Sequence, residues 1–316
     1  MNEFQFIDTL KNIKKNNPIN LSIGDDTAII NFKQNENKLI CSDTLVEDIH
    51  FSFNYFTLYD VIKKAIIVNL SDILAMNGKP LYYLLNLSIP KNRIKYLNEV
   101  ANAIRDINAE YKIDLIGGDT TSSKDKTFVS VTMIGETNNP ILRDGATLHD
   151  EIFIGGMPGK SSIALEFLLQ NKDTYYKKYH IEPKINFKFL ELFKKSLPNS
   201  LIDISDGVIN DLSHILEETN NKNKSNLGAI IYNNSFKDFD PEFFNYTDNN
   251  NLDPYNFIYN GGEDFIPLFT TNRANDVISI ANELNLPLIN IGKITDKNGI
   301  LDLNNKKLQK KGYLHF

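Results

Sequence analysis

Aspartates that stand beside glycine or hydroxyl residues are the feature of this sequence most able to do chemistry. Asp25 and Asp26 follow Gly24, and Asp119 follows a pair of glycines. Four more stand in a similar setting or inside an apolar helical pattern: Asp43, Asp72, Asp203 and Asp206. Glycine beside a carboxylate lets the backbone and a metal ion approach closely. Oxygen ligands without sulfur, and almost without histidine, favour Mg²⁺ or Mn²⁺ over zinc.

Each of these aspartates, taken alone, has an ordinary structural explanation. Asp43 could cap a turn, Asp206 could be the N-cap of the next helix, and Asp25 with Asp26 could form a hairpin turn. Asp72 is harder to explain in this way, because a carboxylate within an apolar helix pattern costs free energy unless a cation or donor compensates it. The set as a whole therefore predicts a site for divalent cations.

The charge of the chain agrees with bound cations. The net charge is −6 and the pI is near 5.5, which argues against non-specific nucleic-acid binding because such binding needs a basic face. If the ligands are phosphates, cations held by carboxylates must neutralise them in place of a field of Lys and Arg. Cys41 is the single cysteine, so an intramolecular disulfide and a cysteine-based metal cluster are both excluded.

Composition and hydropathy predict a globular protein of the cytoplasm. The 316 residues suffice for two domains, and 41% hydrophobic with 23% charged residues is close to the average for globular proteins. The first residues contain no apolar segment of signal-peptide length. No apolar run is long enough to cross a bilayer, so we expect no membrane partner.

Alternating apolar runs predict a mixed α/β fold of two domains that positions these carboxylates. In the first half, strands are expected at 21–23, 28–30, 38–42, 81–89, 114–116 and 128–134, with helices at 62–74 and 93–111. Thr57 to Asp60 resembles a capping box before the first of these helices. Turn residues near 138–140 favour a boundary that gives domains 1–137 and 138–316.

The second half repeats the alternation. Strands are expected at 151–154, 201–204, 229–232, 265–269 and 288–291, and helices at 161–169, 187–193, after Asp206 and at 273–285. The carboxylates then fall at strand ends or in turns: Asp43 ends a strand, and residues 117–121 form a turn around Asp119. Strand ends are where ligands bind in α/β folds. Two Asn-rich stretches, 219–226 and 245–251, are expected to be loops.

The segment Gly155 to Ser161 looks like a nucleotide-binding P-loop, but its spacing is wrong. The motif needs four residues between its glycines, and only three separate Gly155 from Gly159. Pro158 also removes a backbone N–H that a phosphate would need. We therefore favour a tight strand-to-helix turn.

One histidine stands where it could reach a ligand. His50 follows Asp43 closely, whereas the other four are expected on the surface or behind the ligand contacts: His149, His180, His214 and His315.

Eight short motifs, taken in order, resemble those of the thiamine-monophosphate kinase family. This family belongs to the superfamily of aminoimidazole ribonucleotide synthetase and selenophosphate synthetase. The motifs are IGDDTA at 23–28, SDTLVEDIHF at 42–51, VNLSD at 68–72, IGGDTT at 116–121, RDGA at 143–146, IDISDG at 202–207, GGEDF at 261–265 and GY at 312–313. They span almost the whole chain, and their combination is specific although each alone is not.

The resemblance implies ATP-dependent phosphorylation of thiamine monophosphate to the diphosphate. It implies several Mg²⁺ ions held by Asp26, Asp43, Asp72, Asp119, Asp203 and Asp206, with help from Ser42 and the backbone of Cys41. It also implies ATP contacts from Gly118, Asp119, Arg143 and Ser205, and thiamine contacts from His50, Glu263 and Tyr313. The implied fold is the two-domain fold of aminoimidazole ribonucleotide synthetase, paired as a homodimer through the N-terminal sheets, with ATP held near that interface.

Three features depart from the family pattern. Cys41 stands where Ser or Thr is usual, which is tolerable if only its carbonyl is a ligand. Asp48 replaces a usual Gly before His50, and an Asn-rich insert at 219–226 lengthens a segment of the second domain.

The implied reaction needs no general base. A phosphate monoester has a second pKa of about 6 and is largely ionised at neutral pH. The protein must instead position two polyanions and neutralise their charge, so we expect direct in-line transfer. The alternatives are a sibling ATP-using enzyme and a non-catalytic nucleotide- or metal-binding protein on this fold. Selenophosphate synthetase needs a reactive Cys or selenocysteine in an N-terminal Gly-rich segment, which this chain lacks.

Overall fold

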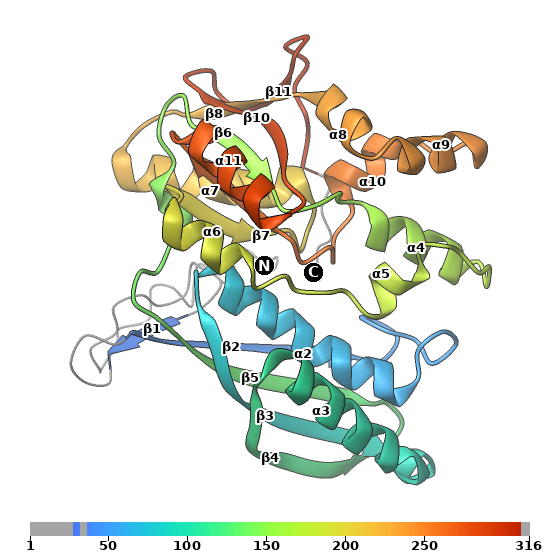
Figure 1. The fold of residues 1–316 in the computed structure, drawn as a ribbon. Helices are drawn as coiled ribbons and strands as arrows, with labels where there is room; N and C mark the ends of the chain where they lie inside the picture. The colour runs from blue at the N-terminus through green and yellow to red at the C-terminus, as the bar shows by residue number, and fades with distance from the viewer. Residues whose placement is uncertain (1–27, 32–36, 311–316) are drawn as a thin grey trace.

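Each half of the chain builds one mixed β-sheet with its own helices (Figure 1). The computed structural model describes residues 28–31 and 37–310. The predicted strand at 21–23, the carboxylates of Asp25 and Asp26, and Tyr313 lie outside these residues. The prediction of a mixed α/β fold with two sheets is confirmed.

The N-terminal sheet has five strands in the order β1-β2-β5-β3-β4. They are β1 Ala28–Asn31, β2 Asn37–Val46, β3 Lys79–Pro90, β4 Asp114–Ser123 and β5 Phe128–Thr137. All neighbours are antiparallel except β3 and β4, which run parallel. Parallel pairing requires a crossover between the two strands, and the 3₁₀ helix η1 (Lys91–Tyr96) with α3 (Leu97–Tyr111) supplies it.

Helix α2 (Leu58–Ala75) lies between this sheet and the C-terminal half (Figure 1). It begins at the predicted capping box, in which Thr57 and Asp60 each bind the other's backbone N–H. Most of its residues are buried, because it packs on β2 and β5 on one side and on the C-terminal half on the other. One hydrophobic cluster accordingly runs from the N-terminal sheet to Phe189 and Phe269.

The C-terminal sheet has six strands in the order β11-β8-β10-β6-β9-β7. They are β6 Glu151–Ile154, β7 Ser200–Asp203, β8 Gly228–Ile231, β9 Pro267–Thr271, β10 Ile289–Thr295 and β11 Ile300–Asp302. The helices of this half are α4 Lys160–Leu169, α5 Lys177–Ile181, α6 Phe189–Lys195, α7 Val208–Asn223, α8 Asn233–Phe239, α9 Pro241–Asn249, α10 Pro254–Asn260 and α11 Ala274–Leu284.

Several local predictions are wrong. Residues 117–121 are part of β4 and not a turn, because β3 offers them a complete row of backbone partners. Asp43 lies inside β2, which continues to Val46. The Asn-rich stretches at 219–226 and 245–251 lie largely within α7 and α9, where buried residues such as Leu216 and Phe244 hold the helices against the core. The predicted helix at 93–111 begins as η1 and becomes α-helical at Leu97.

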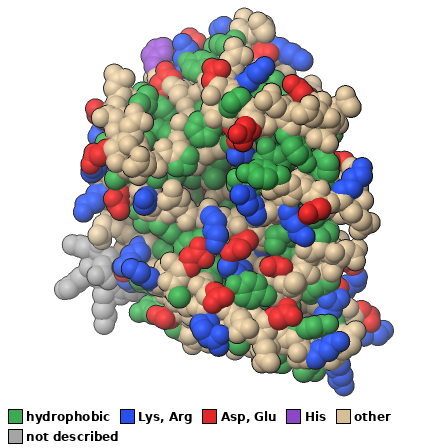
Figure 2. Space-filling view, turned by 45° about the vertical axis from the view of Figure 1, so that its right-hand side comes forward, with side chains coloured by type: hydrophobic (Ala, Val, Ile, Leu, Met, Phe, Trp, Pro, Cys, Tyr) green, Lys and Arg blue, Asp and Glu red, His purple; other side chains and the backbone are tan. Residues whose placement is uncertain are grey.

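The outer surface carries charges of both signs. Figure 2 shows acidic and basic side chains interspersed over one face of the molecule. Among the helices of residues 37–310, none is both long enough and apolar enough to span a membrane.

Candidate active site

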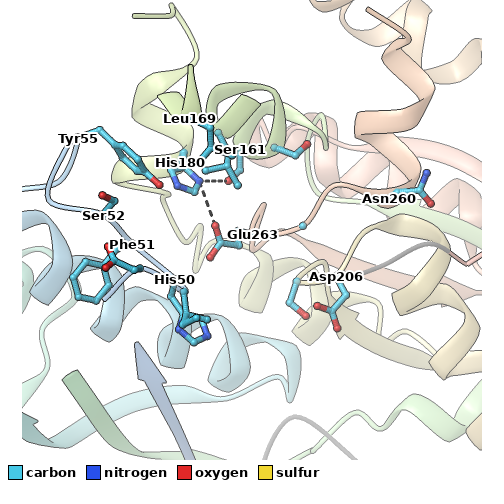
Figure 3. Close-up of a pocket in the computed structure, with 16 residues that line it drawn as sticks. His50, Phe51, Ser52, Tyr55, Ser161, Leu169, His180, Asp206, Asn260 and Glu263 are labelled. Carbon is cyan, nitrogen blue, oxygen red and sulfur yellow. Dashed lines mark hydrogen bonds and ion pairs between the residues drawn. The ribbon is translucent and has the colours of Figure 1, made fainter. Parts of the chain in front are cut away.

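A cavity of about 500 Å³ lies between the two halves of the molecule. Residues 48–55 after β2 form one wall, and α4 and α5 form another. The segments that follow β7 and precede β9 contribute the rest (Figure 3). The predicted site residues His50, Ser205, Asp206 and Glu263 all line this cavity.

His50 is held by the turn that follows β2. Its backbone N–H donates to the carbonyl of Val46 at 2.9 Å, and the N–H of Val46 donates to His50 Nδ1 at 3.0 Å. Because Nδ1 accepts this bond, the neutral ring carries its proton on Nε2. That nitrogen is therefore the donor of the neutral ring.

Asp48 occupies a position whose backbone favours glycine. Its φ is 67°, in the left-handed region, which Asp tolerates better than most residues with a Cβ. Its carboxylate forms an ion pair with Lys126, from the turn between β4 and β5. This backbone conformation suits the Gly that the resemblance predicts here, and Asp48 keeps the turn while adding an ion pair.

The segment after β7 is fixed by buried carboxylates. Ser71 on α2 donates to Asp203 Oδ2 at 2.6 Å, which ties the end of β7 to the N-terminal half. The backbone N–H groups of Ser205 and Asp206 both donate to Asp211 Oδ2 at 3.1 Å. Burial, followed by the charges of Asp206 and Asp203, raises the pKa of Asp211 well above its ordinary value. One hydroxyl and three carboxyl groups therefore lie close together where β7 ends: those of Ser71, Asp203, Asp206 and Asp211.

Glu263 reaches the cavity from a segment that docks against this one. Its backbone N–H donates to the carbonyl of Ser205 at 2.8 Å, and its φ is 61°. Its Oε2 lies 3.0 Å from Lys64 Nζ and 3.2 Å from His180 Nδ1. Burial alone would raise the pKa of Glu263, but Lys64 and His180 together outweigh it and hold that pKa below its ordinary range. Glu263 is therefore an anion at the wall of the cavity.

The predicted strand-to-helix turn before α4 is present, and a carboxylate binds its amides. Gly159 has φ 89°, and its N–H donates to Asp264 Oδ2 at 2.7 Å. The N–H of Ser161 donates to Asp264 Oδ1 at 3.3 Å. The groups that would bind a phosphate in a true P-loop thus bind a side chain of the same protein.

The predicted metal ligands fall on two sides of the N-terminal sheet. Cys41 faces α2, with its Sγ 3.5 Å from Asn69, so alternation along β2 points Asp43 to the same side. Asp72 lies one helical turn beyond Asn69. Ser42 faces the other way and contacts Thr132 there.

Asp119 lies on β4, three strands away from Asp43. Backbone pairing places Asp43, Val131, Leu85 and Gly118 in one row across the sheet, with Asp119 one residue further. Neighbouring strands lie about 4.8 Å apart, so about 14 Å separates the two strands. Within one chain, Asp43 and Asp119 can therefore serve only different ions.

Geometry alone does not define a metal centre here. In the part of the chain that the structure describes, no three His, Cys, Asp or Glu residues form a group able to hold one ion. Asp26 lies outside that part. Arg143, in the 3₁₀ turn η2 (Arg143–Gly145), is half-buried, and its carbonyl accepts from Thr219. The metal and ATP assignments remain predictions.

Known proteins resemble this chain over its full length. Residues 24–137 match the family described as AIR synthase related protein, N-terminal domain. The thiamine-monophosphate kinase of Buchnera aphidicola subsp. Schizaphis graminum is 34% identical, with 100% of this chain and 99% of that protein covered. The chain belongs to the thiamine-monophosphate kinase family.

Further similarities agree with this family. The thiamine-monophosphate kinase of Bacillus subtilis is 31% identical over the full length of both proteins. The solved structure of AaThiL complexed with AMPPCP and TMP superposes with a TM-score of 0.85 at 28% identity, covering 100% of this chain and 97% of that one. The predicted family is thereby confirmed.

Sequence reasoning missed two residues near this site, Lys64 and Asp211. His180 was expected on the surface or behind the ligand contacts; it is 1% exposed, so it is not on the surface, and it lies against Glu263. Lys64 is 0% exposed and Asp211 is 2% exposed. Lys64 did carry a signal, because it is a charge inside the apolar pattern of α2, as Asp72 is.

Proposed function

We propose that this protein catalyses transfer of the γ-phosphate of ATP to thiamine monophosphate, which yields thiamine diphosphate. The observation that carries the proposal is that His50, Ser205, Asp206 and Glu263 line one cavity. The sequence motifs predict substrate, ATP and metal contacts for these same four residues. Full-length similarity to thiamine-monophosphate kinases supports the same reaction.

Mg²⁺ is the cation that these donors suit. Asp43 and Asp72 lie on β2 and α2, which pack against each other, and Ser71, next to Asp72, donates to Asp203 at the end of β7. All three aspartates offer carboxylate oxygens, as Mg²⁺ prefers. We propose that these residues hold Mg²⁺ with Asp206 and Asp26, with Asp119 and Ser42 serving on the open side of the sheet. Bound Mg²⁺ would neutralise the phosphates and align the acceptor.

The proposed chemistry is direct in-line transfer. The acceptor phosphate is already ionised near neutral pH, so the protein's work is positioning and charge neutralisation. Two like charges about 4 Å apart repel by roughly 4 kcal/mol at an effective dielectric near 20. Rapid-quench trapping of a phosphorylated aspartate competent to form product would overturn this mechanism.

The decisive experiment is to incubate pure protein with ATP, Mg²⁺ and thiamine monophosphate and to follow the formation of the diphosphate. Free thiamine serves as the parallel acceptor, because it lacks the ionised phosphate that the mechanism requires. We expect transfer to thiamine monophosphate and little or none to thiamine. Transfer to neither acceptor, with ATP and Mg²⁺ saturating, would defeat the proposal.

The environment of Cys41 counts against one sibling activity. Cys41 is 6% exposed, lies within β2, and places its Sγ against Asn69. A cysteine in this position is a poor candidate for the exposed reactive thiol that selenophosphate synthesis needs.

We also propose a cytoplasmic homodimer that pairs through the open face and edge of the N-terminal sheet. Helices α2 and α3 cover one face of that sheet (Figure 1). On β3, β4 and β5 of this sheet, large apolar side chains are at least 37% exposed: Tyr82, Leu115, Ile116 and Phe128. The predicted ATP contacts Gly118 and Asp119 lie on β4, the edge strand beside them, so ATP would lie near the interface.

A further inference from the structure

Two buried cationic or titratable side chains meet one carboxylate at the wall of the cavity. Lys64 is 0% exposed and His180 is 1% exposed, and neither has a role in the function described above. Both contact Oε2 of Glu263, at 3.0 and 3.2 Å, so neither occupies Oε1 (Figure 3 shows the His180 contact). The side chain of Glu263 is 29% exposed. One oxygen of the carboxylate is therefore bound by buried side chains, and the carboxylate is open toward the cavity.

The interactions of Lys64 and His180 with Glu263 join the two halves of the molecule. Lys64 comes from α2, whereas His180 and Glu263 come from the C-terminal half. An ammonium group buried this deeply is strongly destabilising unless an ionised partner accompanies it, so Lys64 requires Glu263 as an anion. The ring of Phe56 flanks both partners of Glu263, with its centroid 5.2 Å from Lys64 Nζ and 5.6 Å from the centroid of the His180 ring.

His180 is itself fixed in orientation. Its Nδ1 also lies 3.1 Å from Ser161 Oγ. Tyr55 packs against its ring, with 6.1 Å between the two ring centroids. The tautomer that carries its proton on Nδ1 donates to Glu263 Oε2, 3.2 Å away, because an ionised carboxylate can only accept hydrogen bonds. In this tautomer the imidazole holds Oε2 together with Lys64.

We propose that Lys64 and His180 are positioning residues that hold Glu263 with one carboxylate oxygen aimed into the cavity, where it selects an acceptor that carries a positive charge. This inference rests on the proposed function, because thiamine monophosphate provides such a charge on its thiazolium ring. A carboxylate held by two partners cannot swing away from the cavity, so its interaction with a ligand cation loses little entropy.

The test compares Lys64→Met with Lys63→Met. Lys63 is also a buried lysine of α2, but its partner Glu182 does not line the cavity, whereas Glu263 does. We expect Lys64→Met to raise the KM for thiamine monophosphate by about tenfold, equivalent to about 1.4 kcal/mol, while the KM for ATP stays within about twofold. Lys63→Met should lower stability and leave both KM values near those of the wild type.

A neutral acceptor separates charge selection from general damage. With the thiophene analogue of thiamine monophosphate, which lacks the ring cation, wild type and Lys64→Met should have similar KM values. Three results would overturn the proposal. Lys64→Met could raise the KM for both acceptors by the same factor, raise the KM for ATP as much as that for thiamine monophosphate, or leave the KM for thiamine monophosphate unchanged.

Substitutions at His180 provide the second variant pair, should Lys64→Met fold poorly. Asn places an amide N–H near the position of Nδ1, so His180→Asn should retain most of the preference for the cationic acceptor and His180→Leu should lose it. Equal behaviour of the two variants would overturn the role of His180.

Calorimetric binding of the two acceptors without ATP distinguishes this inference from the proposed function. A wild type that binds the cationic acceptor preferentially but transfers no phosphate would defeat only the function. Equal binding of the cationic acceptor by wild type and Lys64→Met would defeat only the positioning role.

Discussion

Among single residues, Asp264 shows how a side chain can occupy backbone amides that would bind a phosphate in a P-loop. It binds the amides of Gly159 and Ser161, and burial, opposed by these two bonds, raises its pKa to about 7 from an ordinary 3.8. The native state then holds this proton more tightly than the unfolded state between those two values. This group's contribution to stability is therefore lost as the pH rises through that window.

We predict that the Asp264→Asn variant shows a weaker decline of stability with pH than the wild type. Between pH 5 and pH 7 the wild type should lose up to about 1.4 kcal/mol per pH unit from this group, and the variant should lose none of it. Urea unfolding at several pH values measures the difference. Asp253→Asn, at an exposed helix N-cap, is the control and should keep the slope of the wild type. Identical slopes for wild type and Asp264→Asn would contradict the prediction.

The aspartates assigned to Mg²⁺ give a second prediction at this scale. Asp72→Asn and Asp119→Asn should each lower turnover by about a hundredfold, the usual cost of removing one group that stabilises transition-state charge. Both variants should remain folded by circular dichroism. Asp125→Asn, on the exposed turn before β5, is the matched control. Near-wild-type rates at saturating Mg²⁺ would count against the metal assignment.

At the scale of elements, the pairing of β3 with β4 depends on one glycine. Gly118 has φ 140°, and a Cβ there would lie 1.8 Å from the carbonyl oxygen of Leu85. A Cβ on Gly117 would meet only the flexible end of Leu84, at 3.1 Å. The backbone at Gly118 cannot relax without breaking the ladder that positions Asp119.

We predict that Gly118→Ala lowers the free energy of unfolding by about 2–4 kcal/mol, because it combines backbone strain with a clash against backbone. Gly117→Ala should cost about 1 kcal/mol or less. Urea denaturation of both variants checks this, and equal losses would contradict it.

The elements also show what a sequence can reveal. Helix α2 and strand β6 were predictable because their apolar residues repeat with helical or strand spacing over a whole element. The strand through residues 117–121 was not, because two glycines and three polar residues have little strand preference of their own. Its pairing with β3 overrides that preference, and such a partner is invisible in local sequence.

The candidate site also has parts that the sequence predicts and parts that only the fold reveals. Asp43, Asp72, Asp203 and Asp206 could be proposed as metal ligands from the sequence because their local motifs are unusual. The contact between Lys64 and Glu263 joins residues 199 positions apart, so only the fold reveals it. A charge inside an apolar helix was the one available signal, and it applies to Lys64 as well as to Asp72.

At the scale of the whole molecule, the open edge of the N-terminal sheet leads to a prediction about assembly. Ile116 on β4 is 53% exposed, which is unusual for so large an apolar side chain on an edge strand. If the sheets pair there, Ile116→Asp should convert a dimer to a monomer and weaken ATP binding. Sedimentation velocity over a range of concentrations measures the first effect. Leu303→Asp, at an equally exposed site beyond the C-terminal sheet, should leave the assembly unchanged.

The position of helix α2 determines whether the two halves of the chain can be produced as separate fragments. It belongs to the N-terminal half by sequence, yet Ser71 and Lys64 bind partners in the C-terminal half, and the hydrophobic cluster around it continues to Phe269. A gene split after residue 137 would yield one fragment with a bare apolar helix and another with the surface that normally covers it. Such fragments would have to be produced together, because each supplies the missing core of the other.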